Sequence, residues 1–229
     1  MRGLQHHAGR RRRLKKPVRL RLLRDVRTAT FDAASFLRSG IDNPSCHDGC
    51  AGCCYAKVLV GEEVGPQLYL HLKATGQWTP ELRARLEDAA AGMDVTSHAD
   101  WLPLRRPCAL LDERGFGRGR CRVYPVRPVS CASTFAVDAT ADDCAAPGGH
   151  ALRHVVTQEP RVLEPVYRAQ LRLQASMGVR THDVVSLPAA VLFAAAAAEG
   201  APAPAFKRLA RQATGGRSYE EAFDTMEAG

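Results

Sequence analysis

The chain has 229 residues, of which 45% are hydrophobic, and a formal net charge of +8. A chain of this length can bury one core of its own without disulfide staples. The charge is concentrated at one end, because residues 1–40 hold twelve Lys and Arg against Asp25 and Asp32, which leaves about −2 on residues 41–229. The excess positive charge therefore does not belong to the folded body, as it would in a basic nucleic-acid-binding domain.

The N-terminal charges gather in the run from Arg10 to Lys16. Like charges in a run repel one another, which is typical of a solvated tail. The alternative is contact with the phosphates of RNA, DNA or acidic lipid, a salt-sensitive mode of binding that does not read sequence. The run lacks interleaved aromatic residues and any recognisable module, so we interpret it as a tail.

No stretch of the chain approaches the roughly 20 apolar residues that a membrane span requires. The N-terminal charges are also not followed by the apolar region of a signal peptide. We therefore expect a cytoplasmic protein without a membrane partner. Reducing compartments do not sustain structural disulfides, so the eight cysteines are expected to be ligands and not staples.

Helical patterns flank an irregular middle of the chain. Periodic apolar residues, a Thr-Pro start signal at Thr79 and Pro80, and closing glycines at Gly40, Gly76, Gly92 and Gly200 mark the helices. The predicted helices cover residues 18–37, 66–74, 79–91, 160–177 and 188–199. Residues 103–150 are rich in Pro, Gly and Cys, which favours loops and short turns or strands held by an organiser.

These patterns predict a mainly α fold with irregular loops, in which helices flank a small metal-organised cysteine core. We divide the chain into a basic tail and helix (1–40), a metal-binding domain (41–150) and a helical C-terminal region (151–229). A polar tail with weak helical tendency is expected over residues 206–229. Because the ligand loops contain few apolar residues, we expect the metal to contribute to folding.

Four thiols fall within nine residues, in the run Cys46-His47-Asp48-Gly49-Cys50-Ala51-Gly52-Cys53-Cys54. Two thiolates two residues apart in a glycine-containing loop can reach one ion, because the turn directs both sulfurs inward. Cys50 and Cys53 are the best pair on this ground. Adjacent side chains tend to diverge, so one of Cys53 and Cys54 is expected to face away or to serve a second ion, and a vicinal disulfide between them would be strained. The later cysteines, Cys108, Cys121, Cys131 and Cys144, contain no second close pair, unlike an ordinary zinc ribbon.

The spacing of these residues resembles the CxxCxxCC cysteine-cluster family of small bacterial and archaeal proteins. The resemblance rests on the first run together with Pro107-Cys108-Ala109-Leu110-Leu111, Gly119-Arg120-Cys121-Arg122-Val123-Tyr124 and Arg127-Pro128-Val129-Ser130-Cys131. It covers residues 44–135 and implies a zinc- or iron-chelating domain. A related cluster occurs in flagellin lysine methylases. Here three residues separate Cys46 from Cys50, where the family usually has two.

All-thiolate ligation suits both zinc and iron–sulfur clusters. Seven cysteines exceed the four ligands of one zinc ion, which favours an iron–sulfur cluster, of the [4Fe–4S] type before others, or two sites. The nearby arginines would offset the negative charge of a thiolate-bound centre. The predicted metal ligands are Cys50, Cys53, Cys121 and Cys131 first, followed by Cys46, Cys54 and Cys108.

Three hypotheses about activity stay open at this point. The first is a metal-binding protein with a redox role. The second is an enzyme in which a cysteine apart from the ligands, Cys54 or Cys108, performs redox or group-transfer chemistry. The third is a structural zinc module whose basic tail contacts nucleic acid. The sequence names no protein partner or substrate, and we assign no role to Cys144. Arg127 is expected to donate to a ligating sulfur or a carbonyl, and His47 is a weaker ligand candidate.

Overall fold

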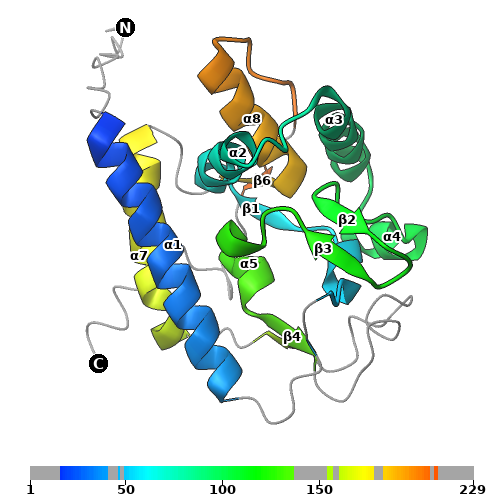
Figure 1. Cartoon of the computed structure of the whole chain (residues 1–229), viewed down its shortest axis with the longest axis horizontal. Coiled ribbons are helices and arrows are strands. Elements are labelled where there is room, and N and C mark those ends of the chain that lie inside the picture. The colour runs from blue at the N-terminus through cyan, green and yellow to red at the C-terminus, as the bar shows by residue number, and fades with distance from the viewer. Residues whose placement is uncertain are drawn as a thin grey trace, which may run out of the picture.

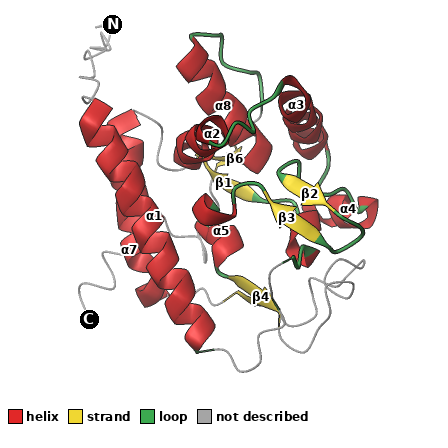
Figure 2. Ribbon diagram, in the orientation of Figure 1, coloured by secondary structure: helices red, strands yellow, loops and turns green. Residues whose placement is uncertain are grey.

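Helices make up most of the described structure, which confirms the mainly α prediction (Figure 2). The computed structural model describes residues 16–40, 46, 49–136, 154–156, 160–177, 183–206 and 209–210. Within these ranges no helix is both long enough and apolar enough to cross a lipid bilayer. The five long helices are α1 (Lys16–Ser39), α2 (Gly65–Ala74), α3 (Pro80–Val95), α7 (Pro160–Met177) and α8 (Leu187–Glu199).

The helix boundaries follow the predicted capping signals with one exception. The Thr79 hydroxyl accepts a 3.3 Å hydrogen bond from the Leu82 amide at the start of α3, and Gly200 ends α8 with φ of 68°. The prediction that Gly92 ends α3 is wrong, because the helix continues to Val95. A Cβ at Gly92 would lie 2.8 Å from the guanidinium of Arg106. This glycine therefore lies within the helix, under the side chain of Arg106, and does not end it.

The main apolar core lies between α2, α3 and α8 (Figure 1). The alanine-rich α8 is buried over most of its length and packs on both of the other helices. Contact with α2 is close, since a Cβ added to Gly65 would lie 1.9 Å from the carbonyl oxygen of Ala190. The small side chains of α8 thus allow close helix packing, whereas from the sequence alone we prefer to attribute this run of alanines to the alanine-rich composition of the chain. The same core contacts Cys108 and Cys121.

A second layer is formed by α1 and α7, which lie side by side along one flank of the molecule (Figure 1). Two apolar clusters join them, one around Leu37, Leu163 and Val166 and one around Val26 and Leu173. α7 also contacts the short 3-10 helix η2 (Glu62–Val64), which leads into α2. The residues that we assign to the C-terminal region therefore contribute to this layer, through α7, and to the main core, through α8.

Short antiparallel strands connect the helices. β1 (Leu59–Gly61) pairs with β6 (Asp183–Ser186), which pairs with β7 (Leu209–Ala210). β2 (Leu111–Glu113) and β3 (Gly119–Cys121) form a hairpin, and β4 (Thr134–Ala136) pairs with β5 (His154–Val156). The expected helical tendency after residue 206 is wrong for Leu209 and Ala210, which extend a sheet. Among the described residues the remaining short helices are η1 (Gly52–Tyr55), α4 (His98–Trp101), η3 (Leu102–Leu104), η4 (Tyr124–Val126) and α5 (Val129–Ala132).

Candidate metal centre

Six of the seven predicted ligand cysteines line one cavity of about 340 Å³. Three separate parts of the chain supply them: the loop that contains η1, the hairpin of β2 and β3 with the turn before it, and α5. The fold thus brings residues that are far apart in the sequence to the same space. The six are Cys50, Cys53, Cys54, Cys108, Cys121 and Cys131.

The first cysteine loop is fastened to the β2–β3 hairpin by backbone hydrogen bonds. Cys50 forms an isolated antiparallel bridge with Arg118, and the Ala51 amide donates a 2.9 Å hydrogen bond to the Gly117 carbonyl. Gly49 has φ of 86°, a conformation that favours glycine, and its carbonyl accepts a 3.0 Å bond from the Gly119 amide. These bonds set the position of Cys50 at the cavity.

The second cysteine segment is bonded to the first. The Cys108 amide donates a 2.7 Å hydrogen bond to the carbonyl of Cys54, which places both residues at one wall. The hairpin register then pairs Leu111 with Cys121. Antiparallel pairing therefore returns the chain from Cys108 to the cavity at Cys121.

The third segment is α5, a single helical turn. Pro128 lies just before the helix, and its carbonyl accepts a 3.0 Å hydrogen bond from the Cys131 amide. The fixed φ of proline suits this helix start. Pro128 therefore starts the turn that brings Cys131 to the cavity.

Burial governs the protonation of most of these thiols. It raises the pKa of Cys108 to about 12, and it raises the pKa of Cys121 and Cys131 as well. Cys54 donates a hydrogen bond to Cys53, which lowers the pKa of Cys53 and raises that of Cys54. Without a nearby cation, buried thiols favour their protonated form. A metal cation would reverse that preference by holding the sulfurs as thiolates.

Arg127 is the arginine that acts most directly on the cysteines. Its positive charge favours the thiolate forms of Cys53, Cys121 and Cys131, and its side chain lines the cavity. The guanidinium also lies 4.2 Å from the ring centroid of Tyr124, which lines the same cavity. No hydrogen bond from Arg127 to a sulfur is needed for this effect.

The other arginines of the motif have mixed placements. Arg120 also lines the cavity. Arg106 lies 3.7 Å from the carboxylate of Asp88, and Arg122 lies 3.7 Å from that of Asp112. The guanidinium of Arg105 lies 5.1 Å from the Phe116 ring centroid. Only part of the positive charge that the sequence places near the cysteines therefore faces them.

Cys46 has different neighbours from the other six. It packs against the apolar cluster between α1 and α7, which includes Leu37 and Phe135, and it does not line the cavity. Its carbonyl accepts a 2.9 Å hydrogen bond from Arg38. His47 and Cys144 lie outside the described residues.

Tyr55 and Glu113 are structural parts of the site that the sequence does not indicate. The Tyr55 hydroxyl donates to the Glu113 carboxylate and accepts a 3.2 Å hydrogen bond from the Gly117 amide. Tyr55 is 2% exposed, and its ring centroid lies 5.0 Å from that of Phe116. These contacts join η1 to the hairpin beside the cavity. Tyr55 and Glu113 are 58 residues apart, and no motif spacing connects them.

The donor set fits a thiolate-bound metal. Among the described residues that line the cavity, all side chains with metal-ligating sulfur, imidazole or carboxylate groups are cysteines. Soft sulfur donors suit zinc and iron–sulfur centres. In the part of the chain that the structure describes, no three His, Cys, Asp or Glu side chains form a ready site for a single ion.

Comparison with known proteins agrees with this chemistry. Residues 45–147 match the family model CxxCxxCC, described as "Putative zinc- or iron-chelating domain". The matched stretch contains all eight cysteines of the chain. Neither a curated protein nor a solved structure matches the chain significantly. The resemblance expected from the cysteine motifs is therefore confirmed over residues 45–147.

Proposed function

We propose that the cavity binds an iron–sulfur cluster through cysteine thiolates and that the protein has a redox role. The observation that carries the proposal is the lining of one cavity of about 340 Å³ by six cysteines. A structural zinc ion takes four ligands, so six sulfurs around one space exceed its needs. Iron–sulfur clusters are larger and are held by cysteine thiolates. A [4Fe–4S] cluster is the form that we favour.

The proposed ligands are those that three different segments bring to the cavity. Cys50 and Cys53 come from the first loop, Cys121 from β3 and Cys131 from α5. Each segment is held by its own backbone hydrogen bonds, which supports the assignment of the three segments to one site. Cys54 and Cys108 are the second-choice ligands in this proposal.

The side chains that line the rest of the cavity suit a buried metal centre whose net charge is small. Apolar side chains line it, among them Val58, Leu110 and Leu187. Arg120 and Arg127 also line it and would offset part of the negative charge of a thiolate-ligated cluster. Apolar surroundings and nearby cations are two of the means by which proteins set the potential of such a centre.

The enzyme hypothesis finds less support at the two cysteines that it names. Burial raises the pKa of Cys108, and donation to Cys53 raises that of Cys54. A nucleophilic cysteine requires the opposite shift, since the thiolate is the reactive form. We therefore give Cys54 and Cys108 roles at the metal. We propose the reducing cytoplasm as the location, because it keeps cysteines in the thiol form that can bind a metal.

The test is metal and sulfide analysis of protein purified without oxygen. We expect iron with matching acid-labile sulfide and a broad absorption near about 400 nm, which is typical of thiolate-bound clusters. Colourless protein with stoichiometric zinc and no sulfide would overturn the cluster and leave a structural zinc module. Protein that binds neither metal would overturn both.

Cysteine variants locate the centre. We expect Cys121→Ser and Cys131→Ser to lose most of the bound metal, because each removes a cavity sulfur. Cys46→Ser is the matched control and should keep the metal, since Cys46 packs between α1 and α7. If only Cys46→Ser lost the metal, Cys46 would be a ligand and the metal centre would not lie in this cavity.

A further inference from the structure

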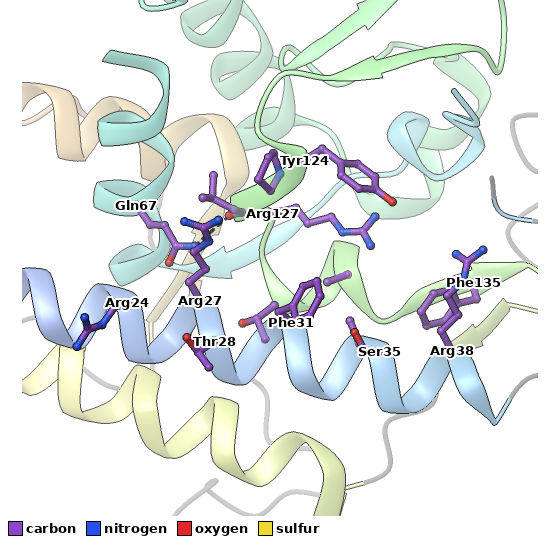
Figure 3. A pocket seen from close by; sticks show the side chains of 15 residues that line it. Arg24, Arg27, Thr28, Phe31, Ser35, Arg38, Gln67, Tyr124, Arg127 and Phe135 are labelled. Carbon is purple, nitrogen blue, oxygen red and sulfur yellow. Dashed lines mark hydrogen bonds between the residues drawn. The ribbon is translucent and has the colours of Figure 1, made fainter. Parts of the chain in front are cut away.

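A second and larger cavity lies next to the cysteine cavity. It has a volume of about 830 Å³ and runs between α1 and the segment from Tyr124 to Phe135 (Figure 3). This volume is in the range of cavities that bind organic ligands of drug size. We call it the arginine groove, after the four arginines in its lining: Arg24, Arg27, Arg38 and Arg127.

The groove has the charge of an anion site. Its four arginines are accompanied by hydroxyl and amide groups, among them Thr28, Ser35 and Gln67. None of the described residues in its lining is an aspartate or a glutamate. Arg24 and Arg27 are exposed, and Arg27 extends from α1 across the groove (Figure 3). Guanidinium groups bind phosphate or carboxylate oxygens in a bidentate manner.

Aromatic rings provide a second kind of contact. Phe31 is 70% exposed and points from α1 into the groove, and Tyr124 is 51% exposed on the facing segment. Phe31 lies between arginines and is not part of the apolar clusters described above. A flat ring of a ligand could stack on it while the ligand's anionic groups bind the arginines.

The groove and the cysteine cavity share a wall. Tyr124 and Arg127 line both, and the Arg127 guanidinium lies 4.2 Å from the Tyr124 ring centroid. A ligand in the groove would therefore contact the same two side chains that border the cysteines. Because it shares these two residues with the cysteine cavity, the groove differs from an ordinary basic patch on the protein surface.

We propose that the arginine groove binds a phosphorylated molecule that carries a flat ring, with the chemistry of a nucleotide. The phosphates lie against Arg24 and Arg27, and the ring stacks on Phe31. The same chemistry is offered by a free nucleotide and by a short single strand of RNA. Arg24, Arg27 and Phe31 do not line the cysteine cavity, so the proposal does not depend on which metal the cysteines hold.

The experiment is calorimetric titration of the full chain at low ionic strength with ATP, with inorganic tripolyphosphate and with a single-stranded RNA octamer. We expect saturable binding of ATP at one site per chain. The double variant Arg24→Ala, Arg27→Ala should weaken it about tenfold or more, since each arginine supplies a charge-assisted hydrogen bond. Phe31→Ala should weaken ATP binding about fivefold or more and leave tripolyphosphate binding unchanged.

Arg172→Ala is the matched control, because Arg172 is exposed on α7 and does not line the groove. It should bind ATP as the unaltered chain does. Binding of the RNA alone, lost in the double variant, would support the groove and identify a polymer as the source of the phosphates. Absence of binding by all three probes, or equal binding in the double variant, would overturn the proposal. Equal binding would indicate phosphate contact elsewhere, as in the basic tail.

Metal and sulfide contents of the same samples are measured in parallel. They report on the proposed cluster, whereas the titrations report on the groove, so that failure of one is distinguishable from failure of the other. The double variant should keep its metal and its circular dichroism spectrum, since Arg24 and Arg27 are exposed and lie outside the cysteine cavity.

Discussion

The side-chain amide of Gln174 donates a 2.7 Å hydrogen bond to the carboxylate of Glu63 in the interior of the protein. Glu63 is 0% exposed and Gln174 is 1% exposed. The bond joins α7 to η2, the turn that precedes α2, and so connects the α1–α7 layer to the main core. A buried carboxylate requires such a partner, because desolvation is costly for a charged group.

The first prediction is that Gln174→Ala destabilises the fold by about 2 to 4 kcal/mol, since it removes a hydrogen bond to a buried carboxylate and leaves a cavity. Urea denaturation followed by circular dichroism measures the free energy of unfolding. Arg172→Ala is the control, because Arg172 is exposed on the same helix, and it should change the free energy of unfolding little. Equal stability of Gln174→Ala and the unaltered chain would contradict the structural role of the bond.

The second prediction concerns the contact of α2 with α8. Gly65 has an ordinary helical φ of −53°, so alanine there is not strained by its backbone. Its Cβ would nevertheless lie 1.9 Å from the Ala190 carbonyl oxygen. Gly65→Ala should therefore destabilise the fold by about 1 to 3 kcal/mol, or more if the helices cannot separate. Urea denaturation again measures the change.

Gly200→Ala provides the contrasting control for Gly65→Ala. Gly200 has φ of 68°, and a Cβ added there would meet nothing within 4 Å, so the cost is backbone strain of about 1 to 2 kcal/mol and no clash. Because only the Gly65 change pushes two helices apart, it should also alter the near-ultraviolet circular dichroism of Trp78, which packs against this core. An unchanged spectrum together with unchanged stability would argue against the close contact.

The third prediction is a pH dependence at the end of α8. Tyr69 on α2 donates a 3.2 Å hydrogen bond to Glu199, and the Trp78 indole donates a second bond of 3.2 Å to the same carboxylate oxygen. Arg83 on α3 pairs with the other oxygen at 3.1 Å. Burial of Tyr69, and then the charge of Glu199, raise the pKa of the Tyr69 phenol above its ordinary value.

A raised phenol pKa means that the folded state holds this proton more tightly than the unfolded state does. The resulting stability is complete below the unfolded pKa of about 10 and is lost as pH rises through the folded pKa. Tyr69→Phe should therefore show a shallower fall in the free energy of unfolding above about pH 10 than the unaltered chain, measured by urea denaturation at a series of pH values. Parallel curves would show that Tyr69 does not carry this dependence, and Tyr124→Phe, at an exposed ring, serves as the control.

The helices, and the closeness of Cys50 and Cys53 within one loop, could be predicted from the sequence because both depend on local signals. Thr79 and Gly200 mark helix ends by their own chemistry, and a CxxC spacing brings two sulfurs together whatever the rest of the chain does. The prediction at Gly92 is wrong because α3 continues to Val95, and the side chain of Arg106, from a later segment, lies over this glycine. Local signals cannot distinguish a glycine that ends a helix from one that admits a neighbour.

The position of Cys46 and the arginine groove depend on tertiary packing. Cys46 is four residues from Cys50, yet the contact of α1 with α7 gives it apolar neighbours instead of the cavity. In the sequence, the arginines of α1 form only the polar side of a helical pattern. They line a groove because the segment of Tyr124 and Arg127, much later in the chain, lies opposite them. No spacing rule relates these two segments.

The last prediction concerns the hydrogen bonds of Tyr55 that join the first cysteine loop to the β2–β3 hairpin, which we call the brace. Tyr55 follows Cys54 directly, and its hydroxyl holds the Glu113 carboxylate and the Gly117 amide of the hairpin that supplies Cys121. Tyr55→Phe keeps the buried ring but leaves both partners without this hydroxyl. We expect the change to cost about 1 to 3 kcal/mol of stability.

The same change should release metal more readily, because the loop of Cys50 and Cys53 is then less firmly held against the hairpin. Competition with a chelator measures the rate of metal loss, which should rise in Tyr55→Phe. Tyr69→Phe is the control and should release metal at the unaltered rate, since its hydroxyl bonds Glu199 and its side chain does not line the cysteine cavity. If Tyr55→Phe lost stability but released metal at the unaltered rate, the brace would support the fold alone. Faster release in Tyr55→Phe would instead show that the positions of the sulfurs depend on a hydrogen bond outside the cavity.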